Sequence, residues 1–249
     1  MTESFVALAE SVVPGCAKTW KGATEDEVDE IEFFAAQDLP PFYRWFLETM
    51  GEDMGLLGHA YLDLRAKTVL AAYNTFEVRR GEGPLYIGRH PEPAFPFRQF
   101  LDLDAPCRED AAVLEEPEAG GDRTRAFETL REQLAWGLLV RCRLATAPQQ
   151  FIGAASSPGG DVVDALQPAL ATLGWNSMLD TGRYCGLYER GQELLLLSNR
   201  VDPKRHETLV VQAGAADAVT LRAALGELAV TADVKVEALR WEPPLPDAG

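Results

Sequence analysis

The sequence predicts an α+β protein in two parts, an antiparallel sheet packed by helices and then a smaller α+β unit. Three observations predict this class. Apolar residues recur at helical spacing in residues 24–51, several later segments alternate or run apolar as strands do, and a separate helix-and-strand rhythm starts near residue 150. The expected domains are residues 1–145 and residues 150–249, joined by a linker at 145–150.

The first helix is expected to begin at Thr24, because the local sequence carries a start signal. Thr24 can cap the first turn, and Glu27, three residues later, completes a capping box. Val28, Ile31 and Phe34 then follow at helical spacing and should face the core.

A second helix is expected directly after Pro40 and Pro41, because proline is tolerated in a first turn, where its missing N–H costs nothing. Gly51 provides the stop signal. The broad apolar face of this helix consists of Phe42, Trp45, Phe46 and Met50.

Strands are expected where the apolar pattern changes period, at residues 60–64, 84–88, 97–104 and 111–115. Residues 115–124 are rich in Glu, Gly and Pro and predict a loop. Thr124 is then expected to cap a third helix, because apolar residues recur every three or four positions after it.

The second part shows the order β-α-β-β-β-α-β, which is that of a small α+β sandwich, with a ferredoxin-like arrangement as one form. Its expected helices are residues 161–173 and 219–228. Its expected strands are residues 150–155, 183–189, 193–198, 208–212 and 234–241.

The net charge of −16 limits the classes of partner. Nucleic acids and anionic membranes are disfavoured because both demand basic patches. A basic protein is a physically sensible partner, since opposite charge speeds encounter and rejects wrong partners. Solubility alone would also account for an acidic chain.

The N-terminal residues, the apolar runs and the cysteines bear on the compartment of the protein and on metal binding. The chain has no run of 18 apolar residues and no Lys or Arg before Lys18, so neither a membrane span nor a secretory signal is expected, and the predicted location is cytoplasmic. Four scattered cysteines, none in a C-x-x-C pair, are typical of buried thiols in a reducing compartment. The three isolated histidines add no zinc motif, and the sequence predicts no metal and no cofactor.

Acidic residues are the candidate contacts for a basic partner. Residues 102–122 hold eight acids and only Arg108 as a base. A solvated surface is an alternative for this segment, and Asp102 with Asp104 could instead hold a cation. The six acids of residues 22–32 partly reflect helix capping. The predicted partner-binding residues are Glu109, Asp110, Glu115, Glu116, Glu118, Asp102, Asp104, Glu52 and Asp53.

Enzyme signatures are thin. The glycine-rich stretch 153–160 could form an anion-binding loop before a helix, but it lacks the lysine of a phosphate-binding motif and the order G-x-G-x-x-G. An ordinary strand-to-helix connection is the favoured interpretation, and no catalytic residue is predicted.

Several segments together match a known pattern. These are Trp20, residues 22–28 (GATEDEV), Leu39-Pro40, residues 42–47 (FYRWFL) and Gly51, followed by the looser matches LYIG at 85–88, FLDL at 100–103 and AFETL at 126–130. Residues 18–142 thereby resemble the SMI1/KNR4-like (SUKH) family. The chain departs from the family pattern after the second helix, where Gly51-Glu52 stands in place of a glycine-rich segment. Residues 150–249 lie outside the family pattern.

The resemblance implies an antiparallel sheet with packed helices and no enzymatic activity. It implies an immunity protein that neutralises a polymorphic or contact-dependent bacterial toxin, often a nuclease or a deaminase. The alternative is a regulatory or scaffolding adaptor without a toxin, and an enzyme with a cleft between its two parts is less favoured. Family analogy carries the immunity role, and the acidic charge is consistent with it.

Overall fold

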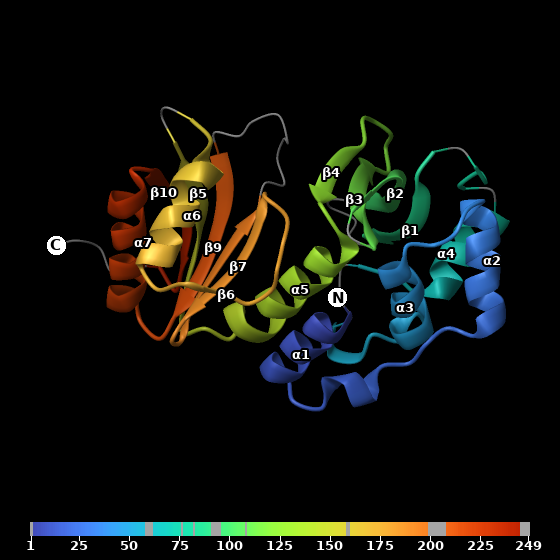
Figure 1. Cartoon of the computed structure of the whole chain (residues 1–249), viewed down its shortest axis with the longest axis horizontal. Helices are drawn as coiled ribbons and strands as arrows, with labels where there is room; N and C mark the ends of the chain where they lie inside the picture. Colours follow the sequence, from blue (N-terminus) through green and yellow to red (C-terminus); the bar gives the residue numbers. More distant parts are fainter. Residues whose placement is uncertain are drawn as a thin grey trace. The chain divides into compact units, whose positions relative to one another are not determined.

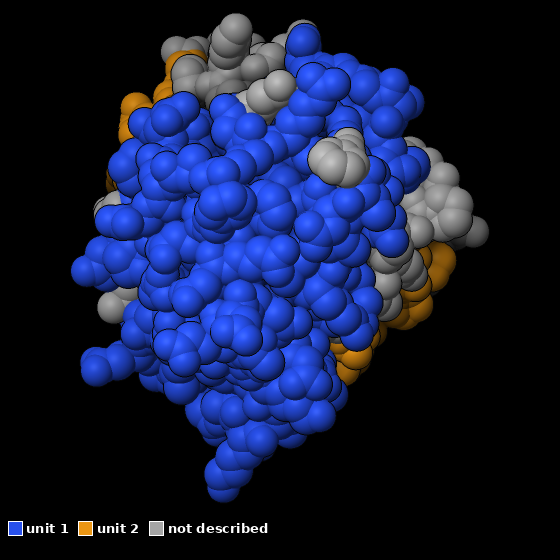
Figure 2. All heavy atoms as spheres, turned by 90° about the vertical axis from the view of Figure 1, so that its right-hand side faces the viewer, with its two compact units in different colours: residues 1–137 blue, residues 138–249 orange. Residues whose placement is uncertain are grey.

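The structure, a computed structural model, describes residues 2–57, 62–75, 77–81, 83–90, 96–107, 109–157, 160–198 and 208–244. The chain divides into two compact units, unit 1 (residues 1–137) and unit 2 (residues 138–249), coloured separately in Figure 2. Each unit has its own antiparallel sheet and helices (Figure 1), which confirms the predicted α+β class. Within the described residues, no helix is both long and apolar enough to cross a membrane.

Unit 1 opens with helices. In its described residues these are α1 (Thr2–Val12), α2 (Glu25–Ala35), α3 (Pro41–Met50) and α4 (Ala66–Asn74), with 3-10 turns at Cys16–Thr19 and Gly55–Leu57. The predicted capping box is confirmed: the Glu27 N–H donates to the Thr24 hydroxyl at 3.3 Å, and the Thr24 N–H donates to the Glu27 carboxylate at 2.9 Å. The start of α3 at Pro41 is confirmed as well.

Helix α1 was not expected from the sequence, and its burial explains why it forms. Phe5 is fully buried and packs edge-on against Phe42 and Trp45 of α3, with ring centroids 5.9 and 6.0 Å apart. Trp20, the upstream tryptophan of the matched pattern, joins this cluster, with its ring centroid 6.3 Å from that of Trp45. Burial of these rings stabilises the packing of α1 on α3.

The sheet of unit 1 is an antiparallel meander of β1 (Leu85–His90), β2 (Phe97–Cys107), β3 (Asp110–Pro117) and β4 (Thr124–Phe127). Strands β1, β2 and β3 confirm those predicted at residues 84–88, 97–104 and 111–115. The strand predicted at residues 60–64 is not found in residues 62–64, where only Asp63 forms an isolated bridge, with Arg89; residues 60–61 lie outside the described residues. Helix α5 (Leu130–Leu139) follows β4.

The predicted helix start at Thr124 was wrong. Thr124 opens β4 and pairs with Glu115 of β3, which suits a β-branched residue. The capping role belongs instead to Thr129, whose hydroxyl accepts a hydrogen bond of 3.1 Å from the Glu132 N–H. Ladder pairing across the sheet therefore overrode a local start signal.

Unit 2 holds a six-stranded antiparallel sheet with the order β10-β5-β9-β8-β7-β6 among its described residues. In chain order the elements are β5 (Gln149–Ser156), α6 (Val162–Thr172), β6 (Asn176–Ser177), β7 (Cys185–Arg190), β8 (Glu193–Ser198), β9 (Thr208–Ala215), α7 (Ala218–Ala232) and β10 (Lys235–Glu242). Strand β9 lies between β5 and β8 and is antiparallel to both, as in the split β-α-β of a ferredoxin-like fold, with β7 and β6 extending the sheet.

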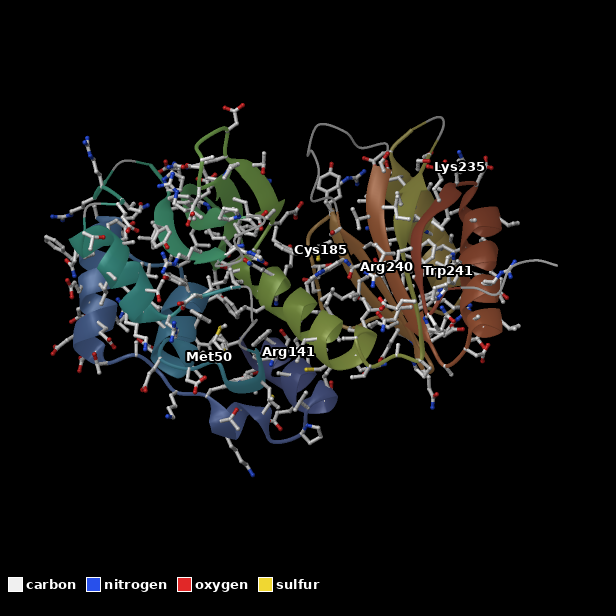
Figure 3. The ribbon with its side chains drawn as sticks, turned by 180° about the vertical axis from the view of Figure 1, so that it is seen from behind. Met50, Arg141, Cys185, Lys235, Arg240 and Trp241 are labelled. Atoms are coloured by element: carbon white, nitrogen blue, oxygen red, sulfur yellow. The ribbon has the colours of Figure 1, made fainter. Side chains whose placement is uncertain are left out.

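Helices α6 and α7 pack on one face of this sheet around buried residues that include Leu166, Leu195, Val211 and Leu225. The other face of β9 contacts the π-helical turn Val140–Leu144 that continues α5. Gly214 of β9 permits this close approach, since a Cβ there would come within 3.1 Å of the Leu144 side chain. Strand β10 forms an edge of the sheet, and Figure 3 labels Lys235, Arg240 and Trp241 along it.

Candidate functional site

A groove of about 810 Å³ lies in unit 1 between the turn that joins α2 to α3, the exposed side of α3, and the hairpin of β2 and β3. We call it the acidic groove. Its apolar part is formed by Leu39, Pro40, Pro41, Trp45, Leu103 and Pro106. Its acidic residues are Glu32, Asp38, Glu48, Glu109 and Asp110, against which Arg44 is the one base in the described lining.

Two hydrogen bonds hold the walls of the groove in place. The Phe42 N–H, near the start of α3, donates to the Glu109 carbonyl at 2.9 Å and joins the helix to the hairpin. The Leu39 N–H donates to the Glu32 carboxylate at 3.2 Å and fixes the turn before α3. Both N–H groups lie at a helix entry, where backbone donors lack partners within the helix.

Arg44 organises the charges along one wall. Its guanidinium lies 2.5 Å from the Glu32 carboxylate and 3.5 Å from that of Glu48. The hydrogen bond from Arg44 lowers the pKa of Glu32, and the same bond raises the pKa of Arg44. Asp38 and Glu109 are exposed at the groove. The groove therefore keeps an excess of negative charge above an apolar floor, which suits a basic segment of a protein.

The interpretation of Asp110 as a surface contact is corrected by its burial. Its side chain is fully buried and accepts hydrogen bonds from the N–H of Ala111 at 2.8 Å and of Arg131 at 2.9 Å. Asp110 thus caps the start of α5 from a strand distant in sequence. Burial raises its pKa to about 6 even though the backbone donors oppose the shift.

The loop predicted around Glu115 and Glu116 is also corrected, because both residues belong to β3. The Glu116 carboxylate is nearly buried between the guanidinium groups of Arg98 and Arg123, so it stabilises the sheet and cannot reach a partner. Glu115 receives a hydrogen bond of 3.2 Å from the side chain of Gln99.

The remaining predicted contacts are dispersed around unit 1. Glu109 lines the acidic groove, and Asp102 and Asp104 flank Leu103 on β2. Glu118 is exposed in the turn after β3. Glu52 and Asp53 are exposed after α3, where both backbone N–H groups donate to the carbonyl of Lys21. The structure thus brings Glu109 and Asp110 to the groove and leaves the others outside its lining.

Sequence reasoning missed Glu32, Asp38, Arg44 and Glu48 as groove residues. The spacing of Arg44 and Glu48, four residues apart on one helix, is a readable signal for an ion pair. Their meeting with Glu32 depends on the packing of α2 beside α3, which the local sequence does not specify. Trp45 belongs to the predicted apolar face of α3, and it is only partly buried.

The described residues hold no group of three or more His, Cys, Asp or Glu side chains that could bind a metal ion. The start of α6, after the glycine-rich stretch, is capped by the Asp161 carboxylate, which accepts from the Val163 N–H at 2.8 Å. This negative charge occupies the position that an anion would take; residues 158–159 of the stretch lie outside the described residues.

Comparisons with family models, with curated proteins and with solved structures found no match to this chain. The SMI1/KNR4-like resemblance therefore stays a prediction.

Proposed function

We propose that the protein is a non-catalytic immunity protein that binds and neutralises a basic bacterial toxin domain, of the nuclease or deaminase class, in the cytoplasm. The acidic groove is the contact surface in this proposal. The observation that carries it is the combination of exposed carboxylates, Asp38, Glu48 and Glu109, with an apolar floor that includes Trp45.

Each part of the groove has a role in such a complex. The carboxylates attract Lys and Arg side chains, and the net charge of −16 steers a basic partner toward the protein. The partly exposed ring of Trp45 offers a surface for a cation and for apolar burial. The volume of about 810 Å³ accommodates several side chains of an inserted loop.

Neutralisation follows from the chemistry of the proposed targets. An enzyme that acts on a nucleic acid holds the phosphates with basic residues. An acidic protein that covers those residues competes with the substrate for the same charges. An immunity protein that covers the substrate-binding residues of the toxin would protect the cell by binding alone, without any catalytic step of its own.

The test is co-expression with the toxin encoded beside this gene, followed by size-exclusion chromatography of the purified pair. We expect protected cells and a stable complex. Asp38→Lys and Glu48→Lys together should weaken binding by about tenfold at low salt, because two attractive charges become repulsive. Glu52→Lys together with Glu118→Lys is the matched control, since it makes the same change in net charge at two exposed residues outside the groove.

Three outcomes separate the alternatives. Unprotected cells together with no complex would contradict the proposal. A complex with a basic protein that has no toxic activity would favour the adaptor function through the same groove. Equal loss of affinity in the control with Glu52→Lys and Glu118→Lys would place the contact outside the groove.

A further inference from the structure

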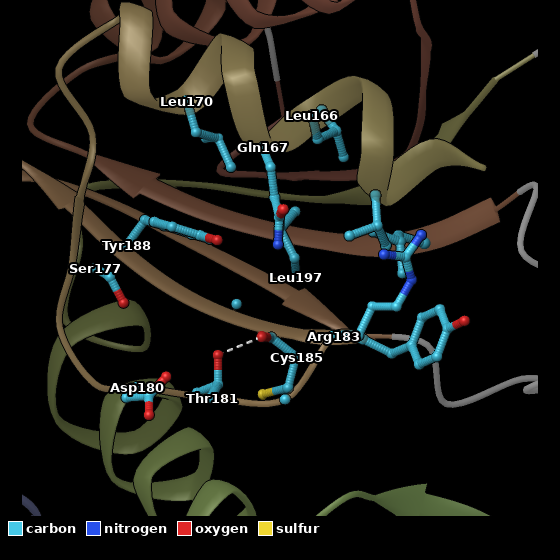
Figure 4. A pocket seen from close by; sticks show the side chains of 15 residues that line it. Leu166, Gln167, Leu170, Ser177, Asp180, Thr181, Arg183, Cys185, Tyr188 and Leu197 are labelled. Atoms are coloured by element: carbon cyan, nitrogen blue, oxygen red, sulfur yellow. Dashed lines mark hydrogen bonds between the residues drawn. The ribbon is translucent and has the colours of Figure 1, made fainter. Parts of the chain in front are cut away.

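The six-stranded sheet of unit 2 ends differently at its two edges. At one edge β6 has only two residues, and the segment from Ser177 to Cys185 follows it and lines, with α6, a cavity of about 170 Å³ (Figure 4). A very short edge strand protects a sheet from pairing with another chain. At the other edge β10 runs for eight residues, and no second strand among the described residues pairs with its outer side. Strand β10 therefore presents a row of outward backbone N–H and C=O groups.

A β-bulge at Leu239 determines which side chains of β10 share a face. The four charged residues lie opposite alternate residues of β5, and so on one face, in the pairs Lys235–Ser156, Glu237–Ala154, Arg240–Ile152 and Glu242–Gln150. We call this the charged face of β10. Leu239 is the extra residue of the bulge, and without it Glu237 and Arg240 would lie on opposite faces.

The charges of β10 are balanced, although the whole chain has a net charge of −16. Two bases alternate with two acids along the charged face, and all four side chains are exposed. Within one chain, Lys235 pairs along the strand with Glu237, and Arg240 pairs with Glu242. The edge thus lacks the local excess of negative charge that would repel a second copy of the same strand.

The charged face is complementary to itself in one antiparallel register. With a twofold axis at Ala238, Lys235 of one copy lies opposite Glu242 of the other, and Glu237 lies opposite Arg240. Symmetry repeats both contacts, so every charge of the face meets an opposite charge. Directly opposed side chains of antiparallel strands have their Cβ atoms about 4.5–5.5 Å apart, within reach of an ion pair.

The same register matches apolar residues on the other face of β10. Val236 and Trp241 lie there, half-buried, and in this register Val236 of one copy is opposite Trp241 of the other. A β-branched residue opposite an aromatic one stabilises an antiparallel pair. Leu239, whose side chain is 76% exposed in the single chain, lies next to the twofold axis, so the pairing would also cover a large apolar side chain.

Helix α7, which packs beside β10, leaves space for a neighbouring copy. Glu227 of α7 forms an ion pair of 3.0 Å with Arg190 of β7, which places that side of the helix toward the interior of the sheet. The helical spacing places Ala218 and Ala229 on the opposite side, toward the open edge. Small side chains on this side allow the helices of two copies to approach each other.

We propose that two copies of this chain associate through β10 and join their sheets into one continuous antiparallel sheet, with the twofold axis at Ala238. The backbone groups of the open edge supply the attraction, and the charged face selects the register. The partner is a second copy because the pattern of charges matches its own sequence in reverse.

The first test is sedimentation velocity on the full-length protein at physiological salt, over concentrations from about 5 to about 500 μM. We expect a reversible monomer–dimer equilibrium with a dissociation constant on the order of tens of micromolar, since one pair of edge strands buries less surface than a standard interface. A protein that stays monomeric over this whole range would overturn the proposal.

Reversal of charges tests the register. Glu242→Lys should weaken the dimer by about tenfold, because it places lysines opposite each other at two symmetry-related positions. Addition of Lys235→Glu to this variant should restore the natural affinity to within about twofold, because opposite charges face each other again. Glu118→Lys is the matched control: it makes the same change in net charge at an exposed turn of unit 1 and should leave the dimer unchanged.

An equal loss of affinity in the Glu118→Lys control would overturn the role of the charged face. Failure of the double variant to regain affinity would overturn the register.

A cysteine at the twofold axis tests the same register without changing a charge. Ala238→Cys should form a disulfide-linked dimer on mild oxidation, because residues opposite each other in an antiparallel pair have Cα atoms about 4.5–5.5 Å apart, a separation that a disulfide spans. Ala223→Cys, at an exposed position of α7, is the control, and the natural protein gives the background from its own four cysteines. Cross-linking of Ala238→Cys no greater than that of the control would overturn the position of the axis. None of these measurements involves the acidic groove of unit 1, so this inference and the proposed function fail independently.

Discussion

The backbone N–H of Phe42 donates a hydrogen bond of 2.9 Å to the carbonyl oxygen of Glu109, joining the start of α3 to the hairpin of β2 and β3. Glu109 presents its carbonyl from the left-handed region, at a φ of 69°. This bond connects two walls of the acidic groove, although Phe42 and Glu109 are far apart in the sequence.

Glu109→Gly should leave the protein as stable or stabilise it by about 0.5–1 kcal/mol, because glycine adopts a positive φ without the steric cost of a side chain. The carbonyl that accepts from Phe42 is retained. Urea unfolding measures the change in the free energy of unfolding. The same variant should bind a basic partner more weakly, since the groove loses a carboxylate. A stability loss above about 1 kcal/mol would show that the side chain itself supports the hairpin.

Asp110 should make the stability of the protein depend on pH. Its folded-state pKa of about 6 lies above the ordinary value of 3.8, so the folded protein binds the proton more tightly than the unfolded chain. The stability that this proton contributes is full below about pH 4 and is lost as the pH rises through about 6, a total of about 3 kcal/mol.

The measurement for Asp110 is the free energy of unfolding of the natural protein and of Asp110→Asn at pH 4.5 and pH 7.5. Asparagine cannot ionise, so the natural protein should lose stability relative to the variant as the pH rises. A constant difference between the two proteins would contradict the raised pKa. Comparing the pH-dependent change in the free energy of unfolding between the two proteins removes the contribution of all other titrating groups.

Arg44→Gln should lower the free energy of unfolding by up to about 1 kcal/mol near pH 7, because the pair with Glu32 is partly exposed. The direction in which this contribution to stability changes with pH follows from the lowered pKa of Glu32. The stability from this carboxylate is present above its ordinary pKa of 4.5 and is lost as the pH falls through the folded-state value. Chemical unfolding at pH 7 and pH 3 should therefore show a difference that shrinks in acid.

The same Arg44→Gln variant should bind a basic partner faster at low salt, because the groove becomes more negative. Stopped-flow association at two salt concentrations tests this effect. An unchanged association rate would mean that the partner approaches another surface. Glu48, at 3.5 Å from Arg44, keeps its own charge in this variant.

Thr24→Ala should destabilise the protein by about 1 kcal/mol, since the N–H of Glu27 loses the hydroxyl that accepts from it. Thermal unfolding followed by circular dichroism measures the loss. Thr24→Ser is the control, because serine restores the hydroxyl and should recover most of the stability. Equal stability of the alanine and serine variants would rule out an energetic role for the cap.

The sequence by itself determined the features that depend on neighbours along the chain. Thr24 and Glu27 are three residues apart, so the capping box and the start of α2 could be predicted locally. Pro41 determined the start of α3 in the same way. The element order of unit 2 was also predictable except for the two-residue strand β6, because the period of apolar residues reports helices and the longer strands segment by segment.

Only the tertiary structure decided which acidic residues meet at one site. Glu32, Arg44 and Glu109 come from α2, α3 and the β2–β3 hairpin, and no local pattern specifies that they line one groove. Thr124 carried a helix signal and still became a strand, because pairing with β3 satisfied its backbone. Asp110 looked like a surface acid because charged residues are rarely buried, yet the start of α5 supplied the N–H donors that hold it inside. Burial and hydrogen-bond partners are properties of the packed chain, and they decided the difference between a surface charge and a structural one.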